Sequence, residues 1–146
     1  MVNGEKILLN PVDGYEIIDR TWKKGDKVNI EFPMPVRTLA ADERIKDDIG
    51  KIAVQRGPLI YCAEWPDNNT GNVLNLVINK KLEPSSEFVP EMLGGTEIIK
   101  IMGHQVERTL KGKIKSGKDE QITLIPYALW NNRGPGQMMV WIPEKK

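Results

Sequence analysis

The stretch from Lys51 to Asn68, KIAVQRGPLIYCAEWPDN, contains the longest nearly uninterrupted apolar run of the chain and its only cysteine. Read with the two-residue period of a β-strand, its second half presents two mostly apolar faces, as an interior strand does. A helix through Gly57-Pro58 would cost about 3 kcal/mol or more for the proline alone, which excludes that alternative. Because glycine and proline inside a sheet favour a bulge or a bend, we predict one long, kinked strand at the centre of a sheet.

Short apolar segments separated by turn formers recur along the rest of the chain. Val28, Ile30 and Phe32 alternate with polar residues, which predicts a half-buried strand over residues 27–37. The other expected strands are 15–22, 73–78, 87–93, 96–102 paired with 105–110 around Gly103-His104, 122–130 and 138–142. Short strands with turn signals at close intervals, and no convincing helical period, predict an all-β fold. We expect an antiparallel β-sandwich of the jelly-roll type.

Composition excludes several classes of partner. The formal net charge is +1, from 21 basic and 20 acidic side chains, so we expect neither nucleic acid nor a membrane as a partner. No apolar run approaches the roughly 18 residues of a membrane span. A single cysteine, Cys62, cannot build an internal disulfide framework.

The start of the chain suggests that the sequence is a piece of a longer one. Asn3-Gly4 is a strong hairpin cue, yet almost no strand precedes it. The first residues also lack the charged-then-apolar layout of a secretory signal. We therefore expect a chain cut from a larger protein, with its internal boundary at the polar connection that begins with Thr38.

The single histidine and the single cysteine offer little for catalysis. His104 has no cysteine or second histidine at ligand spacing, so we interpret it as an ordinary surface histidine. Cys62 could act as a nucleophile only in a setting that lowers its pKa. Its place in an apolar strand indicates a buried, inert thiol instead.

Glu64 and Asp67 flank Trp65, and paired carboxylates beside an aromatic ring are what a glycosidase uses. The structural alternative is that Glu64 pairs with Arg56 or Arg133, while Asp67 caps a turn by accepting bonds from backbone N–H groups. We favour the structural alternative, because two carboxylates at the end of a strand are common.

Trp65 and Trp130 each lie where an apolar strand becomes an asparagine-rich loop. Tryptophan beside amide side chains can stack on a sugar ring and bind its hydroxyls. It can equally close the edge of a core, with its indole N–H on a loop carbonyl. The candidate carbohydrate contacts are Trp65, Asp67, Asn68, Trp130, Asn131 and Arg133. We have no candidate for a catalytic or metal-binding residue.

Two stretches of the chain carry a family resemblance. The first is QRGPLIYCAE at residues 55–64, followed by Asp67 and Asn68. The second comprises IPY at 125–127, Trp130, NRG at 132–134 and MMVWIP at 138–143. Both resemble segments of the GH127 glycoside hydrolases of the β-L-arabinofuranosidase type. Upstream, Gly14-Tyr15, Arg20, Trp22, Gly25-Asp26 and residues 34–37 are similar to the end of that family's middle β domain. The resemblance covers most of the chain in the expected order.

The resemblance implies a non-catalytic role. In that family a catalytic (α/α)6 barrel binds zinc through cysteines and a glutamate, and one cysteine serves as the nucleophile. We expect no cofactor in this chain, because zinc would belong to the barrel, which is absent here. Residues 1–37 would be the terminal strands of the middle β domain, and residues 38–146 the C-terminal β-sandwich. The partner would be the catalytic barrel of the same parent chain, in a bacterial cytoplasm or periplasm.

Two other hypotheses belong to different classes. One is an autonomous carbohydrate-binding module that uses Trp65 and Trp130 on an arabinose-containing glycan. The other is a domain that forms a homodimer and does not respond to sugars. The isolated chain is expected to be inactive as an enzyme in all three cases.

Overall fold

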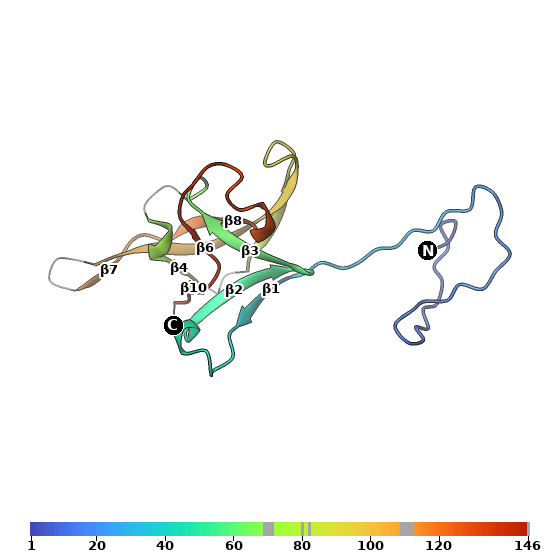
Figure 1. Ribbon diagram of the computed structural model, residues 1–146, viewed down its shortest axis with the longest axis horizontal. Coiled ribbons are helices and arrows are strands. Elements are labelled where there is room, and N and C mark those ends of the chain that lie inside the picture. The colour runs from blue at the N-terminus through green and yellow to red at the C-terminus, as the bar shows by residue number, and fades with distance from the viewer. Residues whose placement is uncertain (69–71, 80, 82, 109–112, 146) are drawn as a thin grey trace. The chain divides into compact units, whose positions relative to one another are not determined.

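The computed structural model describes residues 1–68, 72–79, 81, 83–108 and 113–145, and the chain divides into two compact units, Met1–Pro33 and Met34–Lys146. The second unit contains all the strands named below (Figure 1). The division after Pro33 follows from contacts within each unit. The predicted boundary after Arg37 comes instead from the domains of the family that the chain resembles, and it remains a prediction. In the described part, no helix is long and apolar enough to cross a membrane.

The strands of the second unit form antiparallel pairs in a curled sheet with the order β1-β2-β3-β8-β6-β4. Two further strands, β5 and β7, pair with β6, while β9 pairs with β3 and β10 with β2. The strands are β1 Val36–Ala40, β2 Lys51–Arg56, β3 Leu59–Glu64, β4 Leu76–Ile78, β5 Ser85–Val89, β6 Thr96–Arg108, β7 Ile114–Ser116, β8 Glu120–Pro126, β9 Met138–Met139 and β10 Ile142–Pro143. Short 3-10 turns are η1 Lys46–Asp48, η2 Val73–Asn75 and η3 Tyr127–Leu129. The predicted all-β, antiparallel, sandwich-like fold is confirmed.

The predicted kinked strand is wrong, because β2 and β3 form a tight hairpin. Arg56 pairs with Leu59, which leaves Gly57-Pro58 as a two-residue loop. Gly57 has a φ of 55°, and the proline ring fixes its own φ near about −65°. A positive φ at the first central residue alone defines a type II′ turn, whose twist matches that of the flanking strands. The glycine and the proline therefore reverse the chain rather than bend it.

The predicted hairpin around Gly103-His104 is also wrong, because both residues lie within a single strand, β6, which is 13 residues long. Gly103 is needed here for space. A Cβ atom on it would lie 2.3 Å from the carbonyl oxygen of Val77 and 2.4 Å from Cδ1 of Ile122. Glycine within a strand often marks such a close approach of another backbone. The result is a strand long enough to pair with β4, β5, β7 and β8.

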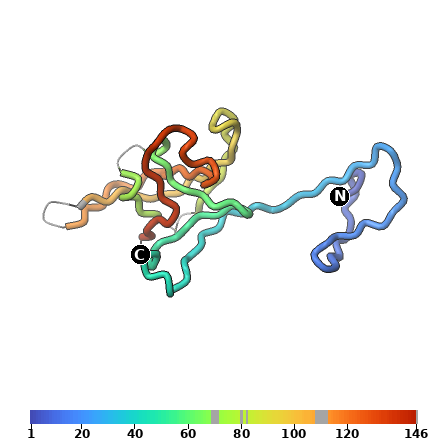
Figure 2. Tube along the Cα trace, in the orientation of Figure 1, coloured from blue at the N-terminus to red at the C-terminus, as the bar shows by residue number. Residues whose placement is uncertain are grey.

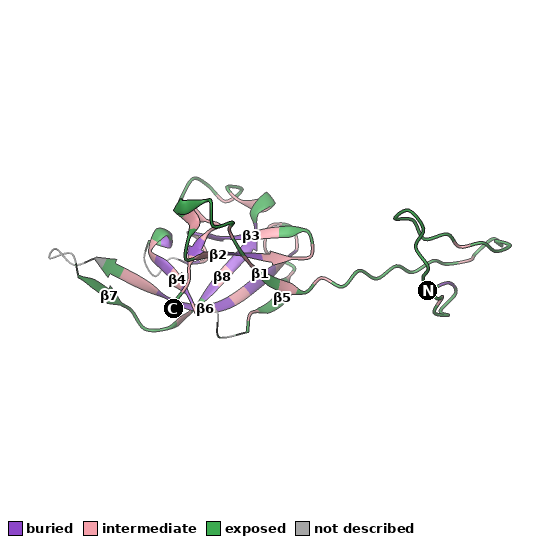
Figure 3. Cartoon of the chain, turned by 90° about the horizontal axis from the view of Figure 1, so that it is seen from below, coloured by how far each residue is buried: buried purple, intermediate pink, exposed green. Residues whose placement is uncertain are grey.

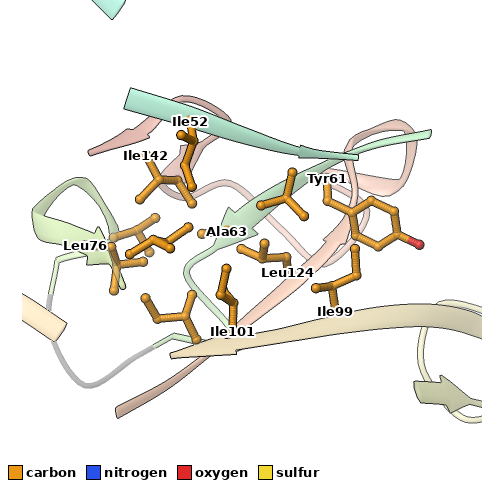
Figure 4. Packing of buried hydrophobic residues seen from close by; sticks show 12 residues of the cluster. Ile52, Tyr61, Ala63, Leu76, Ile99, Ile101, Leu124 and Ile142 are labelled. Atoms are coloured by element: carbon orange, nitrogen blue, oxygen red, sulfur yellow. The ribbon is translucent and has the colours of Figure 1, made fainter. Parts of the chain in front are cut away.

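The core lies inside the curl of the sheet, on the face shared by alternate residues of its central strands (Figure 4). Its buried members are Ile52, Val54, Tyr61, Ala63, Val73, Leu76, Ile78, Ile99, Ile101, Ile122, Leu124 and Ile142. Figure 3 shows buried residues gathered on β2, β6 and β8. This burial of apolar side chains is the main favourable term for folding of the second unit.

A second buried cluster covers the opposite face of β3, β6 and β8. Cys62, Ile98 and Ile125 form its centre, and half-buried side chains from the 127–141 segment pack over it, including Trp130 and Met138. The C-terminal segment crosses β3 to reach β9, as the orange-to-red tube in Figure 2 shows. The central strands are thus covered on both faces, as their two apolar faces predict.

Candidate functional site

The candidate site lies at the end of β3, where Glu64 follows the buried run. Strand β8 ends at Pro126 opposite Tyr61, and the chain then turns through η3 and loops back so that β9 pairs with Ala63 and Glu64. This return carries residues 130–137 across the end of β3. Side chains almost 70 residues apart in sequence, such as Glu64 and Arg133, therefore meet.

Three charged side chains, Glu64, Asp67 and Arg133, form a closed cluster there. Glu64 has no exposed side-chain surface. It accepts hydrogen bonds from the backbone N–H of Asn131 at 2.9 Å and from Nε and Nη2 of Arg133, the former at 3.1 Å. Asp67 accepts from Nη1 of Arg133 at 2.7 Å and from Nη2 at 2.5 Å. One guanidinium thus binds two carboxylates in forked geometry.

The electrostatics of the cluster favour a structural role. The hydrogen bonds that the guanidinium donates to Asp67, and then those that it donates to Glu64, raise the pKa of Arg133 well above its usual range, against the opposing effect of desolvation. Both oxygens of each carboxylate are engaged, and Glu64 does not reach solvent. A general acid or base must contact its substrate, so this arrangement is suited to holding two chain segments together rather than to transferring protons.

The structure decides between the two pairings expected for Glu64. The pairing of Glu64 with Arg133 is confirmed, whereas Arg56 lies 3.3 Å from Glu97 instead. The carboxylate of Asp67 was expected to cap a turn. Its hydrogen bonds come from the guanidinium of Arg133 instead. The cluster therefore includes a second carboxylate that the sequence assigned to a local turn.

Asn68 lies beside the cluster, and its side chain makes the backbone hydrogen bonds that a further residue of β3 would make. It is only 6% exposed. Its Nδ2 donates to the carbonyls of Glu64 and Thr123, both at 2.9 Å, and its Oδ1 accepts from the N–H of Thr123 at 3.0 Å. The side chain thus extends the pairing of β3 with β8 beyond the end of β3. Its amide is occupied by backbone groups rather than directed at solvent.

Replacing Asn68 with alanine is expected to lower the free energy of unfolding by about 2 kcal/mol, because the N–H and carbonyl of Thr123 lose their partner in a poorly solvated place. Urea unfolding followed by tryptophan fluorescence measures the change. The matched control is Asn132→Ala, which removes one exposed bond to the carbonyl of Leu129. That variant is expected to lose less than about 0.5 kcal/mol. Equal losses in both variants would contradict the assignment.

The two tryptophans of the predicted sugar site differ in environment. Trp65 is 41% exposed, and its backbone N–H donates to the carbonyl of Gln137 at 3.1 Å. A Cβ atom on Gly136 would lie 1.8 Å from Cδ1 of this indole, so the loop backbone lies directly against the ring. Trp130 is half-buried, packs on the second cluster and stacks on Tyr127 with parallel rings 6.4 Å apart. Trp130 closes a core edge, and Trp65 retains an accessible face.

Cys62 and His104 both lie inside the fold. The expectation of a surface histidine is wrong, because His104 is 3% exposed in the middle of β6, with Nδ1 3.4 Å from Oδ1 of Asp119. Cys62 is fully buried, and burial followed by the charge of Glu64 raises the pKa of its thiol to about 12. Among the described residues, no three side chains of the His, Cys, Asp or Glu types are placed to hold a metal ion.

Cys62 is expected to resist thiol reagents at pH 8 while the protein is folded, because the reactive thiolate forms only near pH 12 and the sulfur is shielded. Labelling should become fast and complete in denaturing urea. A Ser86→Cys variant, at an exposed position on β5, is the positive control. Rapid labelling of the native wild-type chain at pH 8 would contradict this account.

One feature of the site was missed from the sequence: an open apolar groove of about 620 Å³ on the outer face of the β2–β3 hairpin. Its lining residues are Leu39, Ala53, Ile60, Tyr127, Met138, Met139, Val140 and Trp141. The run Met138–Trp141 is the available signal, but its pattern predicts only a closing strand. Aromatic and methionine side chains without charge are typical of the centre of a protein–protein interface.

Comparisons with known proteins place these observations in a family context. The family model described as the glycoside hydrolase family 127 C-terminal domain matches residues 36–143. The chain is 29% identical to the non-reducing end β-L-arabinofuranosidase of Bifidobacterium longum subsp. longum, over 96% of this chain and 23% of that protein.

Solved structures give the same result. A GH127 β-arabinofuranosidase is 39% identical, with a TM-score of 0.87 over 99% of this chain and 23% of its own. The GH127 β-L-arabinofuranosidase of Geobacillus stearothermophilus T6 is 34% identical, with a TM-score of 0.82 over 99% of this chain and 24% of its own. The chain therefore spans about a quarter of the length of the relatives that it matches.

Proposed function

Because this chain belongs to the glycoside hydrolase family 127 C-terminal domain family, we propose that it is the non-catalytic, accessory β-sandwich of a β-L-arabinofuranosidase-like glycoside hydrolase. It packs on and stabilises a catalytic (α/α)6 barrel supplied by the parent polypeptide. The observation that carries this proposal is the closed Glu64–Asp67–Arg133 cluster. Its carboxylates are the pair beside Trp65 that a glycosidase could use, and both are bound to one arginine inside the fold.

The zinc that the family resemblance implies does not fit this chain. The only cysteine is fully buried among apolar side chains, whereas a zinc site needs several converging ligands. No three ligand-type side chains converge in the described part of the chain. We therefore assign zinc to the barrel.

The apolar groove supports a packing role. Tyr127, Met139 and Trp141 line it together with aliphatic side chains of β1 and β3. Grooves that bind sugars combine aromatic rings with several convergent polar groups, and this one lacks such groups among its lining residues. An apolar surface of the barrel is the occupant that this chemistry favours.

The proposal is tested by assaying the purified chain on aryl and natural arabinofuranosides in the presence of zinc and a reductant. We expect no turnover from the wild-type chain or from Glu64→Gln. Turnover by the wild-type chain that is abolished in a folded Glu64→Gln variant would overturn the proposal. Circular dichroism of both proteins shows whether the variant is folded.

A second candidate function is an autonomous carbohydrate-binding module, favoured by the accessible face of Trp65. It predicts a shift of tryptophan fluorescence when an arabinose-containing oligosaccharide is titrated, and loss of that shift in folded Trp65→Ala. The accessory proposal predicts no shift in either protein. Sedimentation over a range of concentrations separates both from a simple homodimer, which would associate without any response to the sugar.

A further inference from the structure

Asn3 and Gly4 form the centre of a tight, exposed turn in the first unit. Their φ values are 52° and 84°, and two consecutive positive values are the signature of a type I′ turn. Val2 and Glu5 bond to each other in both directions across the turn, at 2.8 and 3.0 Å. Gly4 is exposed, and its N–H takes no part in these two bonds.

An asparagine that precedes a glycine can lose its side-chain amide in water. The backbone nitrogen of Gly4 attacks Cγ of Asn3, so that an N–Cγ bond forms and the Cγ–Nδ2 bond breaks. The leaving amide takes the proton of the attacking nitrogen and departs as ammonia. Water then opens the resulting imide at either carbonyl, which gives aspartate or isoaspartate. Glycine hinders the attack least, because it has no Cβ atom.

A second segment holds the side chain of Asn3 and prevents this attack. Nδ2 donates to Oδ1 of Asp26 at 2.9 Å, and Oδ1 accepts from the N–H of Lys27 at 2.8 Å. We call these two bonds the Asn3 clamp. Asp26 is itself fixed, because its other oxygen accepts from the N–H of Lys23 at 2.9 Å. The amide of Asn3 therefore cannot turn towards Gly4 unless both bonds of the clamp break.

Loss of the amide would change the clamp from an attraction to a repulsion. The N–H of Lys23, followed by the amide of Asn3, lowers the pKa of Asp26, so this carboxylate is charged at neutral pH. Deamidation removes the donor that lies 2.9 Å from Oδ1 of Asp26 and introduces a second negative charge there. Two carboxylates in contact cannot easily both stay ionised. The isoaspartate product also lengthens the backbone within the turn.

The clamp lies beside the backbone pairing of the first unit. The N–H of Asn3 donates to the carbonyl of Lys27, and the N–H of Asn29 donates to the carbonyl of Met1, both at 2.9 Å. Val2 lies between these bonds and is only 2% exposed. The side chain of Asn3 therefore fastens the pairing that buries Val2.

We propose that Asn3 is a site of spontaneous deamidation, that the clamp sets its rate, and that the modification releases residues 1–3 from residues 27–29. Water is the only co-reactant. Because ammonia leaves, the change is a one-way switch that depends on the age of the protein. The inference rests on the bonds of the first unit and is independent of the accessory role proposed above.

The rate is tested by incubating the chain at pH 8 and following the peptide that contains Asn3 by mass spectrometry. Asp26→Ala removes the acceptor of Nδ2, so we expect it to speed the deamidation of Asn3 at least about 5-fold. Denaturing urea should have at least as large an effect on the wild-type chain. Equal rates in the native wild type, in Asp26→Ala and in urea would overturn the proposal.

Asp13→Asn creates a matched site within the same molecule. Asp13 and Gly14 have φ values of 51° and 83°, and valine precedes this turn as it precedes Asn3. In the part of the chain that the structure describes, no second segment holds the side chain of Asp13. We expect the new asparagine to deamidate at least about 5-fold faster than Asn3 in the native chain, and at a similar rate in urea. A new site that reacts no faster than Asn3 in the native chain would overturn the role of the clamp.

The structural consequence is tested with Asn3→Asp, which reproduces the aspartate product. We expect the hydrogen-exchange protection of the amides of residues 3 and 29 to fall at least about 5-fold at neutral pH. Asn10→Asp makes the same change of charge outside the clamp and should leave both amides protected. Unchanged protection in Asn3→Asp, or an equal loss in both variants, would overturn the proposed release.

Discussion

Replacing Arg133 with methionine is expected to lower the free energy of unfolding by about 3–5 kcal/mol, because it leaves the fully buried carboxylate of Glu64 without its counter-charge. Asp67 loses both of its bonds to the guanidinium at the same time. The methionine side chain preserves much of the aliphatic stem, so the loss reports charge and hydrogen bonding rather than packing. Urea unfolding of the wild type and the variant measures the difference.

The matched control for Arg133 is Arg44, which makes a forked pair with Asp42. The two side chains of that pair are 89% and 49% exposed, so solvent screens their attraction. We expect Arg44→Met to leave the free energy of unfolding almost unchanged. A loss of comparable size in both variants would show that the burial of Glu64 is not what makes Arg133 important.

Replacing Gly103 with alanine is expected to destabilise the second unit by about 3 kcal/mol, near the upper end of the range for overpacking a core. The added methyl would lie 2.3 Å from the carbonyl oxygen of Val77 on β4 and 2.4 Å from Ile122 on β8. The first of these atoms belongs to the backbone, so the strain cannot be relieved by rotating a side chain. The pairing of β4 with β6 should weaken, and faster amide exchange at Val77 and Ile78 would locate the damage.

Gly50→Ala serves as the control for Gly103→Ala. Gly50 has a φ of 77°, and a Cβ atom there would meet nothing within 4 Å. Its replacement should cost only the strain of a left-handed backbone, about 1 kcal/mol. If Gly50→Ala proved as harmful as Gly103→Ala, backbone freedom rather than close contact would explain the role of Gly103.

The strand content of the second unit could be predicted from the sequence, but the roles of two glycines could not. Gly57-Pro58 and Gly103-His104 each interrupt an apolar pattern, and period alone cannot tell a turn from a close approach of another strand. The positive φ of Gly57 decides the first case, and the second is decided by the Val77 carbonyl oxygen, which would lie only 2.3 Å from a Cβ atom on Gly103. The first depends on the pairing of two strands that are neighbours in the chain, and the second depends on a strand that is distant in the chain.

Only part of the candidate site could be predicted from the sequence. The sequence predicts an ion pair between Glu64 and either Arg56 or Arg133, but it assigns Asp67 to a turn. That Arg133 binds both carboxylates follows from the return of residues 130–137 across β3, which no local pattern encodes. The burial of His104 was missed because it depends on the same long strand, β6, that the glycine pattern concealed.

The most direct test of the central claim, that the cluster on β3 is architectural, is a double-mutant cycle on Glu64→Gln and Arg133→Met. The account predicts that the two losses of unfolding free energy are not additive and that the coupling is about 1–3 kcal/mol, because each change removes the same buried interaction. It also predicts no arabinofuranoside turnover from any of the four proteins. Additive losses, or turnover that depends on Glu64, would contradict the account.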